Sequence, residues 1–202
     1  MRYRPTCFLF LLFLMSSTGL LAQDAPPTVK PVRFLADIAL ELGGDEVAEV
    51  YFTNGNTQSV RAGQGGSLGV GAQFQFKGVE KLLLRSTIGI KYVTTEADNA
   101  HIRLTRIPVQ LAAHWFVAQK FRIGAGVVTH RSIRFKTDGI GDNIQFNSAT
   151  GPLFEIGYGA VGLRYTDMNY KDEFNRKYAA NAIGIAFSLA FPGNHQVFGK
   201  KR

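Results

Sequence analysis

Beyond its first 22 residues, the 202-residue sequence has no run of 18 or more apolar residues, which excludes a bundle of transmembrane helices. Charged residues are also scarce, at 19% of the chain against 46% apolar residues, so intrinsic disorder is excluded as well. The length fits one ordinary domain. The presence of 22 glycines and 16 phenylalanines, with one tryptophan, favours a β protein with tight turns over a helical bundle.

The first 22 residues have the three-part layout of a secretory signal peptide. Arg2 and Arg4 precede an unbroken apolar core, Cys7 to Met15, and small residues follow it. We expect cleavage after residue 22, or alternatively after residue 19. Because Cys7 is the only cysteine, the mature protein is expected to have no disulfide and no thiolate metal ligand. Cleavage would also remove Arg2 and Arg4, which contribute two charges to the net charge of +8. This weakens the case that the charge serves nucleic-acid binding, and we expect no nucleic-acid partner.

The rest of the chain shows hydrophobic alternation with a period of two. At residues 67–77, for example, apolar residues alternate with glycine, serine, glutamine and lysine. Successive side chains of a strand point to opposite faces, so this pattern indicates strands and not helices. The sequence predicts eight of them, at residues 33–43, 66–77, 82–93, 103–116, 121–130, 151–158, 161–170 and 180–191.

The connections between these strands alternate between short and long. Strands two and three, four and five, and six and seven are joined by short turns, whereas the other connections are long: loop one (44–65), loop two (94–102), loop three (131–150) and loop four (171–179). An even number of strands with short turns at one end is typical of bacterial outer-membrane barrels. A soluble lipocalin-like barrel is the alternative, but there the apolar face points inward.

Polarity favours the membrane barrel, because one face of each strand is almost purely aliphatic or aromatic and the other carries Gly, Gln and Arg. We therefore predict an all-β fold, an eight-stranded antiparallel up-and-down transmembrane β-barrel over residues 32–191. A short periplasmic segment (23–31) would precede it and a periplasmic tail (192–202) would follow it, with both termini in the periplasm.

Two sets of residues follow from this alternation. Aromatic residues on the apolar face near the short turns are expected to form a belt at the membrane interface: Phe34, Phe76, Trp115, Phe121, Tyr158 and Phe191. Tyr92 and Tyr170 are weaker candidates for a belt at the other rim. Polar residues on the opposite face are expected to form a network of cross-barrel ion pairs that fills the interior: Asp37, Glu41, Gln73, Arg85, Arg106, Gln110, Arg122, Glu155 and Arg164.

Three segments add a family resemblance: Arg106-Ile107-Pro108-Val109, Glu155-Ile156-Gly157-Tyr158, and the last strand with Phe187, Leu189 and Phe191. Together they resemble the small eight-stranded outer-membrane barrels of the OmpA and OmpX type. The resemblance implies an integral protein in the outer membrane of a Gram-negative bacterium. It also implies contacts with outer-membrane lipid, lipopolysaccharide and the barrel-assembly machinery.

Signals for catalysis are weak. His130 and Ser132 are similar to the His-x-Ser pair of outer-membrane lipid A deacylases, in which a histidine base would activate a serine. The pair falls in the fifth strand and not near the end of the chain, so we expect no catalytic residues. No cofactor site and no metal site is expected either, because the histidines and carboxylates lack ligand spacing.

The loops are the other place for function. In loop one, Asn54-Gly55 lies between two strand-like runs and predicts a tight hairpin, so strands one and two are expected to extend beyond the membrane as a ribbon. Loop three is expected to be a flexible connection. The leading hypothesis is a non-enzymatic structural or adhesive surface protein that meets an extracellular ligand at loops one and three. A lipid A-modifying hydrolase and a narrow solute or ion pore are the alternatives.

Overall fold

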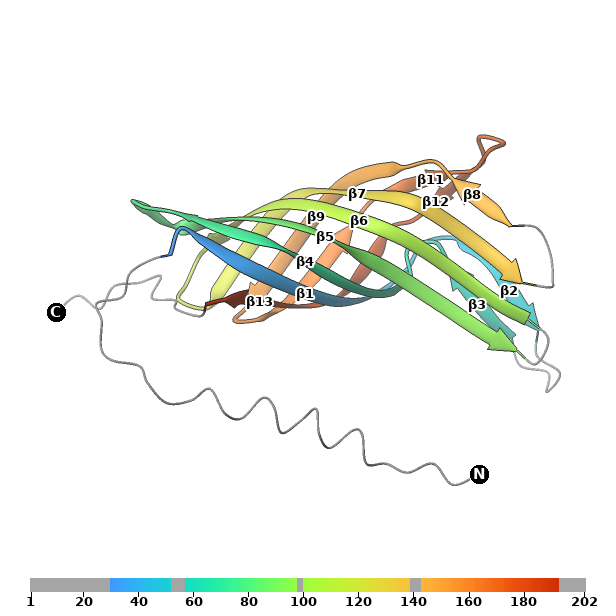
Figure 1. Cartoon of the computed structure of the whole chain (residues 1–202), viewed down its shortest axis with the longest axis horizontal. Coiled ribbons are helices and arrows are strands. Elements are labelled where there is room, and N and C mark those ends of the chain that lie inside the picture. The colour runs from blue at the N-terminus through green and yellow to red at the C-terminus, as the bar shows by residue number, and fades with distance from the viewer. Residues whose placement is uncertain (1–29, 52–56, 98–99, 139–142, 193–202) are drawn as a thin grey trace, which may run out of the picture.

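The computed structural model describes residues 30–51, 57–97, 100–138 and 143–192, and these form a closed β-barrel (Figure 1). Its strands are β1 (Val32–Leu42), β2 (Glu46–Tyr51), β3 (Thr57–Arg61), β4 (Gly65–Phe76), β5 (Val79–Ala97), β6 (Ala100–Phe116), β7 (Phe121–Asp138), β8 (Ile144–Phe146), β9 (Ala149–Tyr158), β10 (Val161–Thr166), β11 (Asn169–Lys171), β12 (Lys177–Ala179) and β13 (Ala182–Phe191). Among the described residues, no helix is long and apolar enough to cross a membrane.

Eight of the strands form the wall of the barrel. Their order in the sheet is β6-β5-β4-β1-β13-β10-β9-β7, and the pairing of β6 with β7 closes the ring. Each wall strand is antiparallel to its neighbours, and each pairs with the next wall strand along the chain. The predicted eight-stranded antiparallel up-and-down barrel is therefore confirmed.

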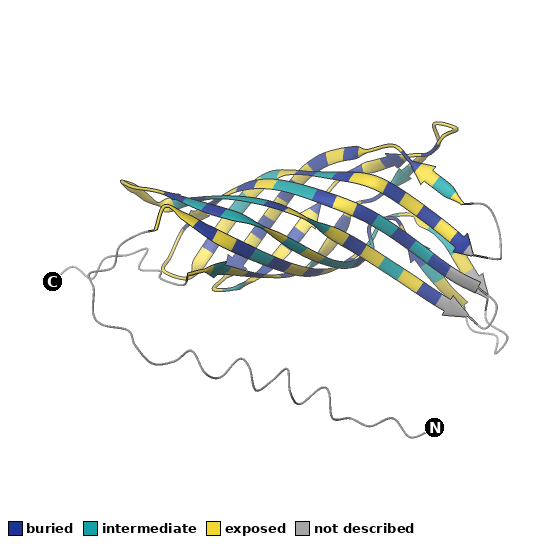
Figure 2. Ribbon diagram, viewed as in Figure 1, coloured by how far each residue is buried: buried dark blue, intermediate teal, exposed yellow. Residues whose placement is uncertain are grey.

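Buried and exposed residues alternate along the wall strands (Figure 2), and over most of the wall the exposed ones are apolar and the buried ones polar. Leu40, Ile88 and Phe154 point outward and are 70%, 54% and 51% exposed. Arg106 and Arg122 point inward and are 1% exposed. This arrangement is the reverse of a soluble barrel, which places its apolar side chains inside.

At the end opposite the short turns, the polarity of the structure reverses. We call this part the cap: β2, β3, β8, β11, β12 and the distal parts of β5, β6 and β7, at the right of Figure 1. Its interior is an apolar cluster in which Val60, Leu104, Ile133 and Phe146 are at most 4% exposed. The described parts of loop three, residues 131–138 and 143–150, are therefore not the flexible connection that the sequence suggested, since β7 runs on to Asp138 and β8 pairs with it.

A β-bulge in β7 produces this reversal on that strand. Arg131 and Ser132 are both exposed, and Ser132 has a φ of 49°, in the left-handed region. Before the bulge the even-numbered residues face inward, and after it the odd-numbered ones do, so that Ile133 and Phe135 enter the cap. The extra residue is the physical reason why the predicted strand ended early, at residue 130.

The seventh wall strand also differs from the prediction. It ends at Thr166 and not at residue 170, and Tyr170 lies in the separate short strand β11. Tyr170 is fully buried, in contact with Phe146 in the cap, with 5.8 Å between the ring centroids. The expectation that Tyr170 belongs to an outer aromatic belt is therefore wrong, because the alternation continues past Thr166 and the even-numbered residues up to Tyr170 keep facing inward.

Loop one folds over the mouth of the barrel and is not a straight extension of β1 and β4. Gly43 and Gly44 have φ values of 128° and 85°, and a side chain on either would collide with the backbone of residues 179–182. β2 and β3 pair as a separate two-stranded sheet. Asn54 and Gly55 lie outside the described residues, as do the expected signal peptide and most of the segments 23–31 and 192–202.

Candidate functional site

A cluster of charged residues crosses the lumen near the middle of the barrel. The guanidinium of Arg164 on β10 donates to both carboxylate oxygens of Asp37 on β1, at 3.0 and 2.9 Å. It also donates to Glu155 on β9 at 3.0 Å, and Glu155 accepts from Arg122 on β7 at 2.9 Å. Four strands are thus joined through side chains that are at most 5% exposed.

Neighbouring polar groups fill the space around this cluster. Ser188 donates to Asp37 at 2.7 Å, and Arg85 donates to Gln73 at 2.9 Å. Arg85 and Gln110 border a cavity of about 20 Å³ beside Asp37, Glu155 and Arg164. That volume holds roughly one water molecule, so the cluster blocks the cross-section of the lumen.

A second polar cluster lies beneath the cap. Lys91 on β5 binds the carboxylate of Glu41 at 2.7 Å and the backbone oxygen of Gly63 at 2.7 Å. Arg106 on β6 donates to the backbone oxygens of Ala62 and Gln64. The residues between β3 and β4 are therefore held in the mouth of the barrel by two buried cations.

The charged residues of the sequence-predicted interior network do not act as one set. Asp37, Arg122, Glu155 and Arg164 come together, with Gln73, Arg85 and Gln110 around them, whereas Glu41 and Arg106 belong to the second cluster. Arg106 binds backbone carbonyls and the hydroxyl of Tyr170, at 3.4 Å, and within the described ranges it has no hydrogen bond to a carboxylate. Backbone carbonyls have no sequence signature, so this role was not predictable.

His130 and Ser132 do not form a catalytic pair. Nδ1 of His130 lies 2.5 Å from the hydroxyl of Tyr170, inside the barrel, and His130 is 3% exposed. Ser132 lies on the bulge and is exposed on the outside. A histidine base has to lie within hydrogen-bond reach of its serine, and the bulge places the two on opposite sides of the wall.

The turn between β11 and β12 projects from the cap. The carboxylate of Asp172 accepts hydrogen bonds from the backbone N–H groups of Phe174 and Arg176, at 2.9 and 2.8 Å, and binds the Arg176 guanidinium at 2.7 Å. Burial works against the ionised form of Asp172, but these donors hold its pKa below the ordinary value. Phe174 is 77% exposed, with the Arg176 guanidinium 5.2 Å from its ring centroid. The turn thus presents an aromatic ring and a cation in a fixed arrangement.

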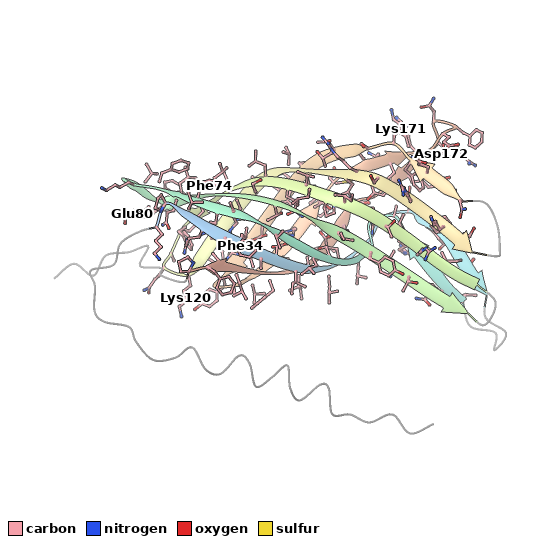
Figure 3. All side chains as sticks on the ribbon, in the orientation of Figure 1. Phe34, Phe74, Glu80, Lys120, Lys171 and Asp172 are labelled. Atoms are coloured by element: carbon pink, nitrogen blue, oxygen red, sulfur yellow. The ribbon has the colours of Figure 1, made fainter. Side chains whose placement is uncertain are left out.

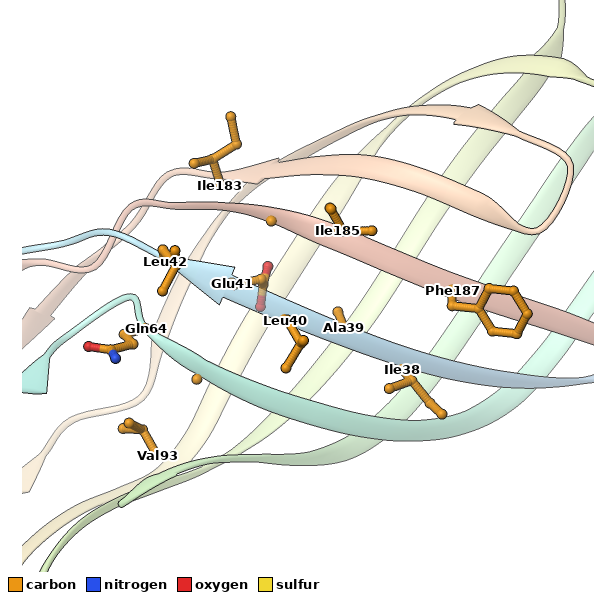
Figure 4. A pocket seen from close by; sticks show the side chains of 12 residues that line it. Ile38, Ala39, Leu40, Glu41, Leu42, Gln64, Val93, Ile183, Ile185 and Phe187 are labelled. Carbon is orange, nitrogen blue, oxygen red and sulfur yellow. The ribbon is translucent and has the colours of Figure 1, made fainter. Parts of the chain in front are cut away.

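A shallow apolar groove lies on the outside of the wall across β13, β1 and β4 (Figure 4). It has a volume of about 640 Å³, and Ile38, Leu40, Ile185 and Phe187 line it. Glu41 is also among the residues around the groove, but its carboxylate is paired with Lys91 inside the barrel. The groove is therefore part of the apolar outer surface and contains no chemistry of its own.

The residues proposed for the aromatic belt all face outward near the end that carries the short turns. Phe34 lies opposite Phe191, and Phe121 opposite Tyr158. Figure 3 places Phe34 at that end. The six residues, Phe34, Phe76, Trp115, Phe121, Tyr158 and Phe191, are between 38% and 64% exposed.

The described part of the chain contains no group of three or more His, Cys, Asp or Glu residues that could hold a metal ion.

No protein-family model matches the sequence, and no curated protein matches it. Among solved structures, the barrel is similar to Ail, the attachment invasion locus protein of Yersinia pestis, solved in complex with the heparin analogue sucrose octasulfate. The two are 8% identical, with 78% of this chain and 97% of Ail covered and a TM-score of 0.43. It is also similar to Neisserial surface protein A, at 14% identity, with 78% and 97% covered and a TM-score of 0.42. At these identities the likeness concerns the fold alone.

Proposed function

We propose that the chain is an integral β-barrel of the outer membrane of a Gram-negative bacterium, with a non-enzymatic surface role. The observation that carries the proposal is the inverted polarity of the wall. Large apolar side chains are exposed on the outside of all eight wall strands, while charged groups are buried within. Exposing so much contiguous apolar surface to water would be unfavourable, whereas a bilayer covers it.

The orientation proposed is the cap outside the cell and both termini in the periplasm. β1 begins and β13 ends at the end that carries the short turns, opposite the cap (Figure 1). In outer-membrane barrels the short turns are periplasmic and the longer connections are extracellular. The segments expected to lie in the periplasm, residues 23–31 and 192–202, are attached at this end.

The surface role is assigned to the cap, because it is a packed structure and not a set of loose loops. Its apolar core holds β2, β3 and β8 in place, and the β11–β12 turn presents Phe174 next to Arg176. A preorganised aromatic and cation are the kind of group that dominates protein contacts. We propose that this turn, together with loops one and three, meets an extracellular partner.

The location is tested by membrane fractionation combined with gel mobility. The full chain should appear with the outer membrane and migrate differently before and after boiling, because a closed barrel resists unfolding in detergent. A protease added to intact cells should cut only in the cap. Recovery as a soluble periplasmic protein would contradict the proposal.

The contact role is tested with the double variant Phe174→Ser, Arg176→Ser on the cell surface. We expect adhesion of the expressing cells to fall toward the level of cells without the protein, while the boiling-dependent mobility stays unchanged. Lys120→Ser, at the opposite end of the barrel, is the matched control and should adhere like the wild type. Full adhesion by the double variant would remove the turn from the proposed contact surface.

A further inference from the structure

The outward side of the cap carries basic side chains that the lumen clusters do not use. β7, β8, β11 and β12 form a strip of adjacent strands there. Arg134 of β7 lies opposite Gln145 of β8, and Lys171 of β11 lies opposite Lys177 of β12. An isolated bridge joins the last residue of β8 to the residue that follows β11. The outward side chains of β7, β8, β11 and β12 therefore share one surface.

Five exposed cations lie on this surface, which we call the basic wall: Arg131, Arg134, Lys136, Lys171 and Lys177. The bulge at Ser132 creates much of it. By shifting Ile133 and Phe135 inward, the extra residue turns Arg134 and Lys136 outward. Among the side chains that the structure describes, the exposed acidic residues nearby in the chain, Asp167 and Glu173, leave a positive excess.

The position of the basic wall on the barrel indicates what it meets. Val127 is the last outward apolar residue of β7, and Arg131 follows four residues later. At 3.3 Å per residue, the β7 part of the basic wall, from Arg131 to Lys136, lies about 13 to about 30 Å beyond Val127, measured along the strand. In the orientation proposed above, this is the level of the lipid headgroups and of the sugars attached to them.

We propose that the basic wall binds the phosphate groups of the glycolipid in the surrounding outer leaflet. The inference rests on the membrane location proposed above. Lys171 projects sideways from the barrel and not along its axis (Figure 3), so the nearest partners are neighbouring lipids. Exposed basic side chains close to a membrane surface attract anionic headgroups, and arginine can bind phosphate oxygens with two parallel hydrogen bonds.

The test measures binding of purified lipopolysaccharide to the full chain refolded in zwitterionic micelles. The wall variant is Arg134→Gln, Lys136→Gln, Lys171→Gln. The matched control is Lys30→Gln, Lys77→Gln, Lys120→Gln, which removes the same charge from exposed positions near the short turns. We expect the wall variant to bind about 100-fold more weakly than the wild type, and the control to bind like the wild type.

Two further arms identify the ligand. Lipopolysaccharide from which the phosphates have been removed should bind the wild type as weakly as the wall variant binds the intact lipid. Soluble inorganic polyphosphate should compete poorly. Equal binding of dephosphorylated lipid would overturn the phosphate assignment, and tighter binding of polyphosphate would overturn the lipid assignment.

The two proposals fail in distinguishable ways. A chain whose gel mobility does not change on boiling would contradict the membrane barrel itself. A chain that shows this change but binds lipopolysaccharide equally well with and without the basic wall would contradict only the present inference. The residues of the basic wall lie beyond the apolar outer surface of the barrel. The basic-wall variant is therefore expected to keep the mobility change.

Discussion

At the scale of single residues, Glu155 lies at the centre of the ion-pair cluster in the lumen. Its carboxylate accepts from Arg122 and Arg164, and Arg85 and His114 lie 3.8 and 3.9 Å away. Glu155 therefore pairs with Arg122 and shares Arg164 with Asp37. Paired charges of this kind tolerate burial, whereas an unpaired charge does not.

Glu155→Ala should therefore destabilise the barrel by roughly 3 to 5 kcal/mol, because it leaves the buried guanidinium of Arg122 without its carboxylate partner. Urea unfolding of the protein in lipid vesicles measures this change. Glu80→Ala, which removes an exposed carboxylate in the β4–β5 hairpin, is the control and should change little. Equal effects of the two substitutions would show that water screens the lumen charges.

Asp172 controls the β11–β12 turn through its ionised form. Its pKa is lowered in the folded protein, so its stabilising effect is present above the unfolded value of about 3.9 and is lost as the pH falls through the lower folded value. The amide resonances of Phe174 and Arg176 should titrate together with a midpoint below about 3.9. In Asp172→Asn the same resonances should not titrate in this range. A midpoint at or above the ordinary value would contradict the hydrogen-bonded arrangement.

At the scale of strands, the outward face of the wall sets a simple expectation. Ile88→Arg puts a charge on the apolar outside of β5 and should cost about 2 to 4 kcal/mol if that surface faces the middle of a bilayer. Gln145→Arg, on the outward face of the cap strand β8, should cost little. The free energy of unfolding of each variant is measured in lipid vesicles. Similar losses at both positions would mean that the apolar surface does not face the middle of a bilayer.

The bulge in β7 predicts which side chains a reagent in water can reach. In a Cys7→Ser background, Arg134→Cys should react rapidly with a membrane-impermeant maleimide, because residue 134 faces outward beyond the apolar surface. Ile133→Cys should react only after unfolding, since Ile133 is fully buried in the cap. The reverse pattern would mean that β7 continues without the extra residue.

These strands also show how far the sequence alone could reach. Continuous alternation located all eight wall strands, since one face is apolar along each of them. The pattern broke where the chain added a residue at Ser132, and there the predicted strand ended early. After Thr166 the alternation of inward and outward residues continues although β10 has ended, so the predicted strand ended too late. β8, β11 and β12 have three residues each, which is too short for any alternation to be visible.

The same limit applies to the candidate site. Alternation placed Asp37 and Arg164 on the inward face, but they are 127 residues apart in the chain, and only the closed ring brings them together. The cap core was hidden for a related reason: Leu104 and Tyr170 lie at the ends of two predicted strands and Phe146 lies in loop three, and only the folded chain brings them together. The basic wall likewise depends on the register between four strands.

At the scale of the whole molecule, the barrel is closed at two levels. Arg164 joins Asp37 and Glu155 across the middle of the lumen, and Arg106 and Lys91 hold residues 62–64 in the mouth. Eight strands enclose only enough space for such side chains. The arrangement favours a solid scaffold over a channel.

Recordings from planar bilayers that contain the refolded full chain should therefore show no steady, large conductance. The physical reason is that both the ion-pair cluster and the held loop would have to move for ions to pass. Boiled protein provides the baseline. A stable open level would contradict the closed lumen and would support the pore alternative.

The cap also has a consequence for how such a barrel enters a membrane. Its apolar core contains Val60, Ile102, Phe135 and Phe146, with Tyr178 packed against them, and these residues come from all four long connections. The core can therefore close only after the last of these connections has crossed to the far side. Once closed, it would have to be dismantled before any connection could return. Formation of the cap core thus makes the last step of insertion, the crossing of the long connections, run in one direction. The free energy of packing the core drives this step, and no external energy source is needed.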